Sequence, residues 1–308
     1  MSYRCVYVRS ADKLSLKDNN LYIKNDQREV TVPLEDIAII LVEDQKSVLT
    51  TKLIASLSSY YIGLITCDEK YNPVSITLPL HMHYKQLHVF QKQLSVKKPL
   101  YSQLWSYIIK QKIQNQRKVI EMTSRDEFTI VKLMEFEKEV KSADKSNREG
   151  VAARIFFNGL YGKYFVRRQN SSDEINSALN YGYTVLAANM SRMLAMYGFN
   201  TILGIHHVSM TNNFNLSYDL MEPFRPLVDY YIYNHLDELS YPLPKELRIG
   251  LISLLQEPIR INDKIYRTEH AMEEVVLSFI KVLDEEDSRH ISLPQVVERA
   301  EEDDESEL

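Results

Sequence analysis

The strongest constraint on the fold is a change in hydrophobic periodicity near residue 84. Before this point, short segments alternate along the chain with the period of two that is typical of β-strands. Val6 and Val8, for example, alternate with Tyr7 and Arg9. Beyond it, apolar residues recur at i, i+3, i+4 and i+7 over long segments, as they do on one face of a helix. The sequence therefore predicts a strand-rich part followed by a helical part.

This order of elements favours an α+β multidomain chain, with a β-sandwich-like N-terminal domain followed by an all-α C-terminal domain. A length of 308 residues exceeds what one core usually serves, so two domains are the default expectation. We expect the β-rich domain over residues 1–80 and a connector over 81–90. The helical domain should span 91–290, with a C-terminal helix and an acidic tail over 291–308.

Individual elements follow from the same patterns. One helix should interrupt the strands at 50–60, and a short hairpin should interrupt the helices at 258–267. Asn147, Thr50 or Thr51, and Ser172 or Asp173 are the expected helix caps. Helices are expected at 84–95, 100–121, 126–141, 147–165, 173–197, 217–239, 244–256, 268–286 and 294–303.

The cysteines and the N-terminus bear on the cellular setting. Only Cys5 and Cys67 are present, which argues against a disulfide framework and for a reducing environment. No apolar run is long enough to span a bilayer, and the first residues lack the apolar core of a signal peptide. We therefore expect a cytoplasmic protein with no membrane partner.

The formal net charge of −5 hides an uneven distribution. Six acidic residues follow Arg299, and without them the charge would be +1. Residues 85–118 contain Lys and Arg but no acid, and aromatic side chains are interleaved with them. That pattern is compatible with a phosphate-binding face with stacking rings, or equally with a solvated helix face whose aromatics turn inward. The aromatic residues concerned are Tyr84, Tyr101, Trp105 and Tyr107.

Two histidines and two acids in the second half could contribute to a metal site. His206 and His207 follow Gly204, and Asp219 and Glu222 come next, three residues apart. On a helix this spacing places both carboxylates on one face. Imidazole nitrogen with carboxylate oxygen suits Mg²⁺, Mn²⁺ or Zn²⁺ better than a metal that needs thiolates. One further carboxylate would complete a catalytic site.

Glu149 could be that carboxylate, in the first turn of the helix that Asn147 is expected to cap. Its charge is favoured there by the helix dipole, so capping alone would explain it. A tandem histidine is more often structural than a ligand, and Asp219 with Glu222 could be a solvated helix start. A di-metal carboxylate bundle and a zinc protease are excluded, because neither Glu-x-x-His nor His-Glu-x-x-His occurs.

Four motifs in order make the signal specific. R-E-G-V-A-A-R-I-F-F contains Glu149, L-N-Y-G-Y covers 179–183, G-I-H-H covers 204–207 and D-L-M-E-P-F-R-P covers 219–226. Together they resemble the CRISPR-associated integrase of spacer acquisition, the first numbered CRISPR-associated protein. The resemblance extends over nearly the whole chain. The G-I-H-H form and the F-N-L-S-Y run before Asp219 look most like the type II branch of that family.

The resemblance implies a set of site residues. Glu149, His207 and Glu222 correspond to the family's catalytic metal ligands for Mg²⁺ or Mn²⁺, with His206 and Asp219 as secondary candidates. The doubled histidine leaves His206 open as the alternative ligand, and Arg225 could equally be a structural ion-pair former. The family's arginine- and glycine-rich loop is replaced here by residues 208–213, which carry no charge. Candidates for contacts with DNA are Arg148, Arg154, Arg167, Arg168, Arg225, Lys97 and Lys98.

The resemblance also implies an activity and partners. The expected activity is that of a metal-dependent DNA endonuclease and integrase, which inserts foreign DNA fragments as new spacers into a CRISPR array by attack of a 3′-hydroxyl. This reaction serves antiviral defence. The expected partners are double-stranded DNA (the protospacer fragment and the repeat-leader) and a second copy of the chain, paired through residues 1–80. A small second CRISPR-associated adaptation protein would complete a heterohexamer, and other type II adaptation proteins are further candidates.

Two alternatives remain open at the level of sequence. One is a metal-dependent nuclease without transfer activity, since cutting and joining use the same metal and phosphate. The other is a non-catalytic DNA-binding assembly protein that retains the three residue types as remnants.

Overall fold

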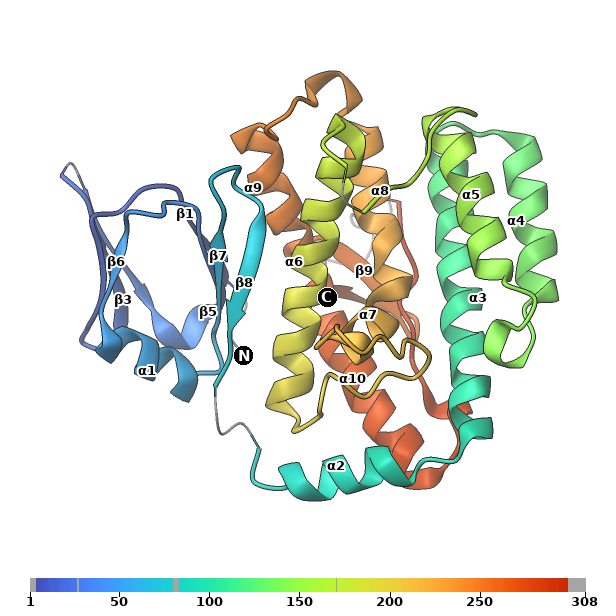
Figure 1. Ribbon diagram of the computed structural model, residues 1–308, viewed down its shortest axis with the longest axis horizontal. Helices are drawn as coiled ribbons and strands as arrows, with labels where there is room; N and C mark the ends of the chain where they lie inside the picture. Colours follow the sequence, from blue (N-terminus) through green and yellow to red (C-terminus); the bar gives the residue numbers. More distant parts are fainter. Residues whose placement is uncertain (1–3, 27, 80–82, 170, 299–308) are drawn as a thin grey trace.

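The computed structural model describes residues 4–298, apart from 27, 80–82 and 170. A strand-rich N-terminal part lies beside a helical C-terminal part along the long axis of the molecule (Figure 1). This is the α+β class, in the order of parts that the change of periodicity predicts. No helix in the described part of the chain is both long and apolar enough to cross a bilayer.

The strand-rich part contains two four-stranded sheets. In the first, β1, β5 and β7 run parallel and β8 is antiparallel to β7. In the second, β3 pairs with β4 and β2 as antiparallel neighbours, and β6 runs parallel to β2. Helix α1 (Thr51–Ser59) starts where the side chain of Thr50 accepts a hydrogen bond from the N–H of Leu53. The strands are β1 (Arg4–Val8), β2 (Lys13–Lys17), β3 (Asn20–Lys24), β4 (Glu29–Pro33), β5 (Ile37–Val42), β6 (Val48–Leu49), β7 (Gly63–Cys67) and β8 (Pro73–Thr77).

Strand β5 is buried on both faces. Ile40 and Val42 belong to a small core shared with the second sheet, whereas Ile39 and Leu41 belong to the large core of the helical part. Successive side chains of a strand point to opposite faces, so this alternation follows from the period of two. The first sheet is therefore sandwiched between the second sheet and the helices (Figure 1).

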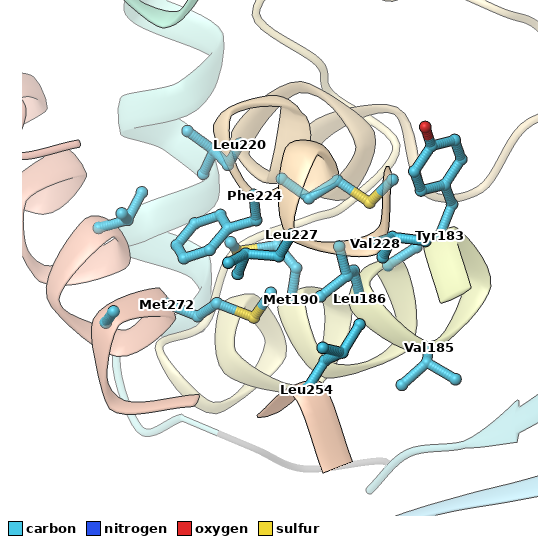
Figure 2. Packing of buried hydrophobic residues seen from close by; sticks show 14 of the residues in the cluster. Tyr183, Val185, Leu186, Met190, Leu220, Phe224, Leu227, Val228, Leu254 and Met272 are labelled. Atoms are coloured by element: carbon cyan, nitrogen blue, oxygen red, sulfur yellow. The ribbon is translucent and has the colours of Figure 1, made fainter. Parts of the chain in front are cut away.

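The helical part is built around α6, whose residues are almost all buried. Figure 2 shows Leu186 and Met190 of α6 beneath Leu220, Phe224 and Leu227 from the following helices, in one apolar cluster. A hairpin of β9 (Pro258–Ile261) and β10 (Lys264–Arg267) occupies the predicted place. The helices are α2 (Gln86–Ser95), α3 (Lys98–Met122), α4 (Glu127–Glu139), α5 (Arg148–Tyr161), α6 (Glu174–Met196), α7 (Asn215–Met221), α8 (Arg225–Tyr233), α9 (Lys245–Ser253) and α10 (Thr268–Glu285).

The single helix predicted over 217–239 is wrong. The chain forms α7, then a 3₁₀ turn over Glu222–Phe224, then α8, and the helical run ends at a further 3₁₀ turn over Leu236–Glu238. Pro223 and Pro226 lack the N–H that a continuous helix would require, so the chain changes its hydrogen-bonding pattern there. This break places Glu222 between two helices rather than within one.

The helix predicted over 294–303 is also wrong in its described portion. Gln295 forms a backbone bridge with Arg260 of β9, with N···O distances of 3.0 and 2.8 Å. The side chain of Asn115 donates to the carbonyl of Pro294 and accepts from the N–H of Val296. These contacts supply the backbone partners that a helix would otherwise provide. Residues 299–303 of that prediction, and the acidic tail, lie outside the described residues.

Candidate active site

Helix α3 contributes two residues to the site, Trp105 and Lys112. They are seven positions apart and therefore lie on the same face of the helix. The ammonium nitrogen of Lys112 lies 2.7 Å from Oε1 of Glu149 and 2.6 Å from Oε2 of Glu222. The buried ammonium group of Lys112 thus contacts both glutamates that the sequence predicts as metal ligands.

Glu149 is held by a well-anchored helix start. The side chain of Asn147 caps α5 by accepting from the N–H of Gly150. The carboxylate of Asp144 accepts from the N–H groups of Arg148 and Glu149, both at 2.9 Å. The Asn147 cap was predicted from the sequence, whereas the contribution of Asp144, which lies in a separate 3₁₀ turn, was not. Two capping acceptors fix the backbone from which the Glu149 side chain projects.

Glu222 is almost completely buried, and both of its carboxylate oxygens face cations. Oε1 lies 2.9 Å from Nε of Arg225, and Oε2 lies 2.6 Å from Nζ of Lys112, although neither contact has the angles of a regular hydrogen bond. Burial would raise the pKa of Glu222, but the charges of Arg225 and Lys112 outweigh it and hold the pKa below its ordinary value. Glu222 is therefore an ionised carboxylate.

Lys112 is kept charged by the same pair of acids. Burial lowers the pKa of a lysine, but the nearby carboxylates of Glu149 and Glu222 more than compensate and raise the pKa of Lys112 above its usual value. This role of Lys112 was not predicted from the sequence, where the residue is one of the basic residues of 85–118. The available signal was its position among apolar residues on the inner face of a helix.

Asp219 organises the loop that carries the two histidines. Its buried carboxylate accepts from the N–H groups of Ile205 and His206 at 2.6 and 2.9 Å, and from that of His207 at 3.3 Å. The loop passes so close that a Cβ on Gly204 would lie 2.3 Å from the carbonyl oxygen of His207. Glycine is therefore required at this position. Asp219 acts on the loop and not as an exposed ligand.

The same carboxylate orients the imidazole of His207. Oδ1 of Asp219 lies 2.5 Å from Nδ1 of His207, which leaves Nε2 as the nitrogen available to a ligand. The hydrogen bond to Asp219 is the main reason that the pKa of His207 is raised; burial opposes it, and Asp219, Glu222 and Glu149 add to it by their charges. A carboxylate behind the distal ring nitrogen is the usual arrangement for a metal-binding histidine.

The second histidine is used differently. The ring of His206 stacks on Trp105 with centroids 4.4 Å apart and planes within 3°, whereas His207 meets the edge of the same indole at 5.7 Å. Trp105 is 1% exposed and contacts both imidazole rings from the interior of the protein. This geometry favours His207 over His206 as the ligand candidate.

The donor set fits a hard divalent ion, although it is not gathered as a coordination shell. Among the residues that the structure describes, no three His, Cys, Asp or Glu side chains lie close enough to hold a metal ion as they stand. The ammonium group of Lys112 occupies the space between the two glutamates. Two carboxylates that already converge on one cation, beside an imidazole with a carboxylate behind it, are nevertheless donors that suit Mg²⁺ or Mn²⁺.

A buried polar network adjoins the site on the side of Arg225. The guanidinium of Arg225 lies 4.5 Å from the ring centre of Tyr183, and the hydroxyl of Tyr183 lies 2.5 Å from Oδ1 of Asp229. Burial raises the pKa of Asp229 to about 7, against the opposing effects of Tyr183, Arg167 and Arg225. Arg225 is thus tied to Glu222 on one side and to an aromatic ring on the other.

Three of the arginines predicted to contact DNA have protein partners. Arg148 lies 3.0 Å from Oε2 of Glu139, and half-buried Arg167 donates to the side chains of Asn176 and Asn180. Half-buried Arg225 lies 2.9 Å from Oε1 of Glu222, as expected of a structural ion-pair former. Contacts of these three with DNA stay predictions.

The remaining DNA-binding candidates lie at the surface. Arg154, Arg168 and Lys98 are exposed, and exposed Lys97 lies 3.6 Å from Oε2 of Glu286. The basic stretch 85–118 is not one uniform face, because Trp105 and Lys112 turn inward. The alternative of aromatics turned inward therefore applies to Trp105.

Comparison with known protein families gives one clear match. The model of the family "CRISPR associated protein Cas1" matches residues 6–240. The chain is 35% identical over 299 residues to the CRISPR-associated endonuclease Cas1 of Neisseria meningitidis serogroup C, covering 96% of this chain and 97% of that protein. It is 25% identical over 241 residues to a CRISPR-associated endonuclease Cas1 of Francisella tularensis subsp. novicida, covering 70% and 73% of the two chains.

Solved structures share the fold. A casposase bound to integration product superposes with a TM-score of 0.72 at 18% identity, covering 93% of this chain and 91% of that one. A Cas1 protein from Thermotoga maritima gives 0.71 at 16% identity, covering 91% and 97%. A chain of a Cas6-RT-Cas1–Cas2 complex gives 0.74 at 20% identity, covering 96% of this chain and 36% of that one.

Proposed function

This chain belongs to the Cas1 family of CRISPR-associated proteins, and we propose that it is a divalent-metal-dependent DNA endonuclease and integrase that inserts foreign DNA fragments as new spacers into a CRISPR array. The relative in Neisseria is named an endonuclease, and the casposase of the same fold was captured with an integration product. Both names support cutting and joining of DNA as the chemistry of this fold.

The observation that carries the proposal is the convergence of Glu149 and Glu222 on Lys112, with His207 near enough for its charge to interact with both carboxylates. Glu149 comes from the start of α5, Glu222 from the break between α7 and α8, and His207 from the loop before α7. These three residues would hold Mg²⁺ or Mn²⁺. Such an ion, when bound, polarises a phosphodiester and stabilises charge on the departing oxygen.

The other residues of the site position and balance this set. Asp219 holds the ring of His207 through Nδ1, and the charge of Arg225 compensates that of buried Glu222. The 3′-hydroxyl of the incoming strand replaces the leaving oxygen at phosphorus, so the number of phosphodiester bonds is conserved. No covalent bond to the protein is needed, and no serine or tyrosine nucleophile is required.

We further propose the partners that the family suggests. These are a protospacer fragment and the repeat-leader DNA, a second copy of the chain paired through residues 1–80, and the small second CRISPR-associated protein in a heterohexamer. The solved structures support this choice, since one holds Cas1 with Cas2 and another is a Cas1–DNA complex. Placement in the type II branch stays a prediction.

Exposed Arg154 and Arg168 should contribute phosphate contacts. Such contacts release counterions, so affinity for duplex DNA should fall steeply as salt rises, with little dependence on fragment sequence. Replacing either arginine with alanine should reduce the slope of log affinity against log salt by about 1. Fluorescence anisotropy across a salt series measures this slope, and Lys141→Ala on the exposed surface beside α4 is a control. An unchanged slope would remove that arginine from the DNA face.

The main test is an integration assay. The protein is incubated with a 3′-hydroxyl duplex and a supercoiled plasmid that carries leader and repeat, with and without its small partner, in Mg²⁺, Mn²⁺ or EDTA. Joined products are expected in either metal, and none in EDTA or with Glu149→Ala or Glu222→Ala. The control Glu121→Ala, on the outer face of α3, should remain active. Cutting without joining would favour the nuclease alternative, and DNA binding alone would favour the assembly protein.

A further inference from the structure

Lys112 presents a conflict between two demands on the same carboxylates. Its ammonium group contacts Oε1 of Glu149 and Oε2 of Glu222, the two glutamates expected to bind the metal. Oε1 of Glu222 is already taken by Arg225, so Glu222 has no oxygen that is free of a cation. Glu149 has its second oxygen, and His207 has Nε2, outside these contacts. Of the three proposed ligands, only Glu222 is fully occupied.

In the metal-free protein, Lys112 has a clear structural use. The side chain of Glu222 is 3% exposed and that of Lys112 is 9% exposed, so both charges are withdrawn from water. A buried carboxylate without a counter-charge is strongly destabilising, and two that face each other would also repel. The lysine therefore holds together a pair of acids that would otherwise separate.

When a divalent ion binds, one of the two cations must release an oxygen of Glu222. Arg225 is the less mobile, because its guanidinium also lies over the rings of Tyr183 and Tyr218 at 4.5 and 5.9 Å. Lysine carries a compact charge on a flexible stem and can move its ammonium group without moving its backbone. Lys112 also contacts both glutamates, so its departure would free an oxygen on each.

On the premise of the proposed metal-dependent function, we propose that Lys112 is a positioning residue that acts as an internal counter-ion. Its ammonium group keeps Glu149 and Glu222 together while the site lacks a metal, and a divalent ion displaces it from Glu222. The site is thus pre-assembled around a cation of the chain itself. The cost of this arrangement is a weaker apparent affinity for the metal.

The charges of the site are consistent with such an exchange. Glu149, Asp219 and Glu222 contribute three negative charges, against two positive charges from Lys112 and Arg225. The acids thus outnumber these two cations. A bound divalent ion would add two positive charges and so strengthen the attraction of the site for a phosphate group.

The test uses Trp105, the sole tryptophan of the chain, whose indole contacts both histidines. Mn²⁺ quenches nearby tryptophan fluorescence, so a titration of the full-length protein with Mn²⁺ yields a dissociation constant without any DNA. We compare the wild type with Lys112→Met, which removes the charge at similar length, and with Lys112→Arg, which keeps the charge in a fork that binds carboxylates in two places. Lys118→Met on the same helix is the matched control.

Lys112→Met should bind Mn²⁺ more tightly than the wild type, by a factor in the range of about 5 to 150 that is typical of coupled sites. Lys112→Arg should bind it more weakly, and Lys118→Met should match the wild type. In EDTA, the melting temperature of Lys112→Met should fall below that of the wild type, and Mn²⁺ should raise it by more than it raises the wild type's.

Unchanged or weaker Mn²⁺ binding by Lys112→Met would overturn the counter-ion role, while Mn²⁺ binding by the wild type would leave the proposed function standing. If Lys112→Met does not fold, the Mn²⁺ affinity of Lys112→Arg is the test. An affinity equal to that of the wild type would then overturn the counter-ion role. Absence of Mn²⁺ binding in all variants would instead remove the metal site itself, and with it the proposed function.

Discussion

Asp219 directs both of its carboxylate oxygens at the loop that carries the histidines. One oxygen contacts Nδ1 of His207, and the pair accepts three backbone N–H groups. The residue therefore controls the direction of the Nε2 lone pair without binding a ligand itself. A carboxylate in this position also makes the imidazole a stronger donor to a metal.

Asp219→Asn should therefore weaken Mn²⁺ binding by about 10- to 100-fold, the usual effect of losing such a partner. The amide would also present N–H groups to backbone donors, which should cost about 1–3 kcal/mol of folding free energy. Quenching of Trp105 measures the first effect and urea denaturation the second. Asp237→Asn at the surface is the control, and an unchanged Mn²⁺ affinity would show that the ring is oriented by other contacts.

Asp229 makes stability depend on pH in an unusual direction. Its pKa is raised to about 7 in the folded protein, mainly by burial, whereas an unfolded aspartate titrates near 4. Between about pH 4 and 7 the folded state therefore holds a proton that the unfolded state has lost. In this window the contribution of Asp229 to the free energy of unfolding falls as pH rises, by up to roughly 1.4 kcal/mol per pH unit.

Asp229→Asn removes this titration but keeps an oxygen that can accept from the Tyr183 hydroxyl. The variant should thus gain stability relative to the wild type as pH rises from 5 to 7, with a constant difference above about pH 7. Urea denaturation at several pH values measures the difference. A difference that does not change between pH 5 and 8 would show that Asp229 is ionised throughout.

Among individual residues, the acids and histidines of the site could be predicted from the sequence, but the position of Lys112 between the two glutamates could not. Motif order could point to Glu149, His207 and Glu222, because each belongs to a run of neighbours that can be compared. Lys112 has no such run, and its meaning depends on burial, which residues far away in the sequence decide. The choice between His206 and His207 likewise rests on Trp105, about 100 positions earlier in the chain.

At the level of elements, the break between α7 and α8 is held by the side chain of Asn115 on α3. Its amide nitrogen donates to the carbonyls of Pro223 and Pro294 at 2.7 and 2.8 Å, and its oxygen accepts from the N–H of Val296. One buried amide thus joins the turn that carries Glu222 to the final extended segment.

Asn115→Ala should leave three buried backbone groups without partners, at about 1–3 kcal/mol each if none is rehydrated. We expect a marked loss of stability in urea denaturation, together with weaker Mn²⁺ binding because the Glu222 turn is loosened. Gln103→Ala on the exposed side of α3 is the control. Loss of stability with unchanged Mn²⁺ affinity would show that the turn keeps its shape without Asn115.

Most element positions could be predicted because helical periodicity and caps are local signals. Thr50, Asn147 and Asp173 cap their helices as expected. The two failures lie at 217–239 and in the described part of 294–303. Local propensity favoured a helix in both, but in the first Pro223 and Pro226 lack an N–H. In the second, the backbone pairs instead with Arg260 and with the side chain of Asn115.

In the whole molecule, two arginines of the helical part join it to the strand-rich part, one by a buried ion pair and one by a hydrogen bond. Arg248 of α9 pairs with Glu43, which follows β5, and its guanidinium lies 4.2 Å from the ring centre of Tyr71. Arg192 of α6 donates to the carbonyl of Tyr61 and contacts Glu269 of α10. Sequence analysis predicted the two parts and their order, but the partners of these pairs are up to 205 positions apart and carry no local signature.

Arg248→Met should leave the carboxylate of Glu43 buried and unpaired, with a loss of about 3–5 kcal/mol of folding free energy. Replacing both residues with methionine should restore much of that loss, since apolar pairs often substitute well for buried ion pairs. Urea denaturation of the single and double variants measures both effects. A small loss of folding free energy in Arg248→Met would show that water or another cation reaches Glu43.

Strand β5 couples the unfolding of the strand-rich part to that of the helical part. Its side chains enter both hydrophobic clusters in alternation, so the first sheet cannot separate from either neighbour without exposing apolar surface to water. The strand-rich and helical parts should therefore melt as one cooperative unit, and the amides of β5 should exchange with solvent only when the entire chain opens. An assembly that pairs through residues 1–80 would then transmit stability to the helices on the far side of the molecule, because both share this strand.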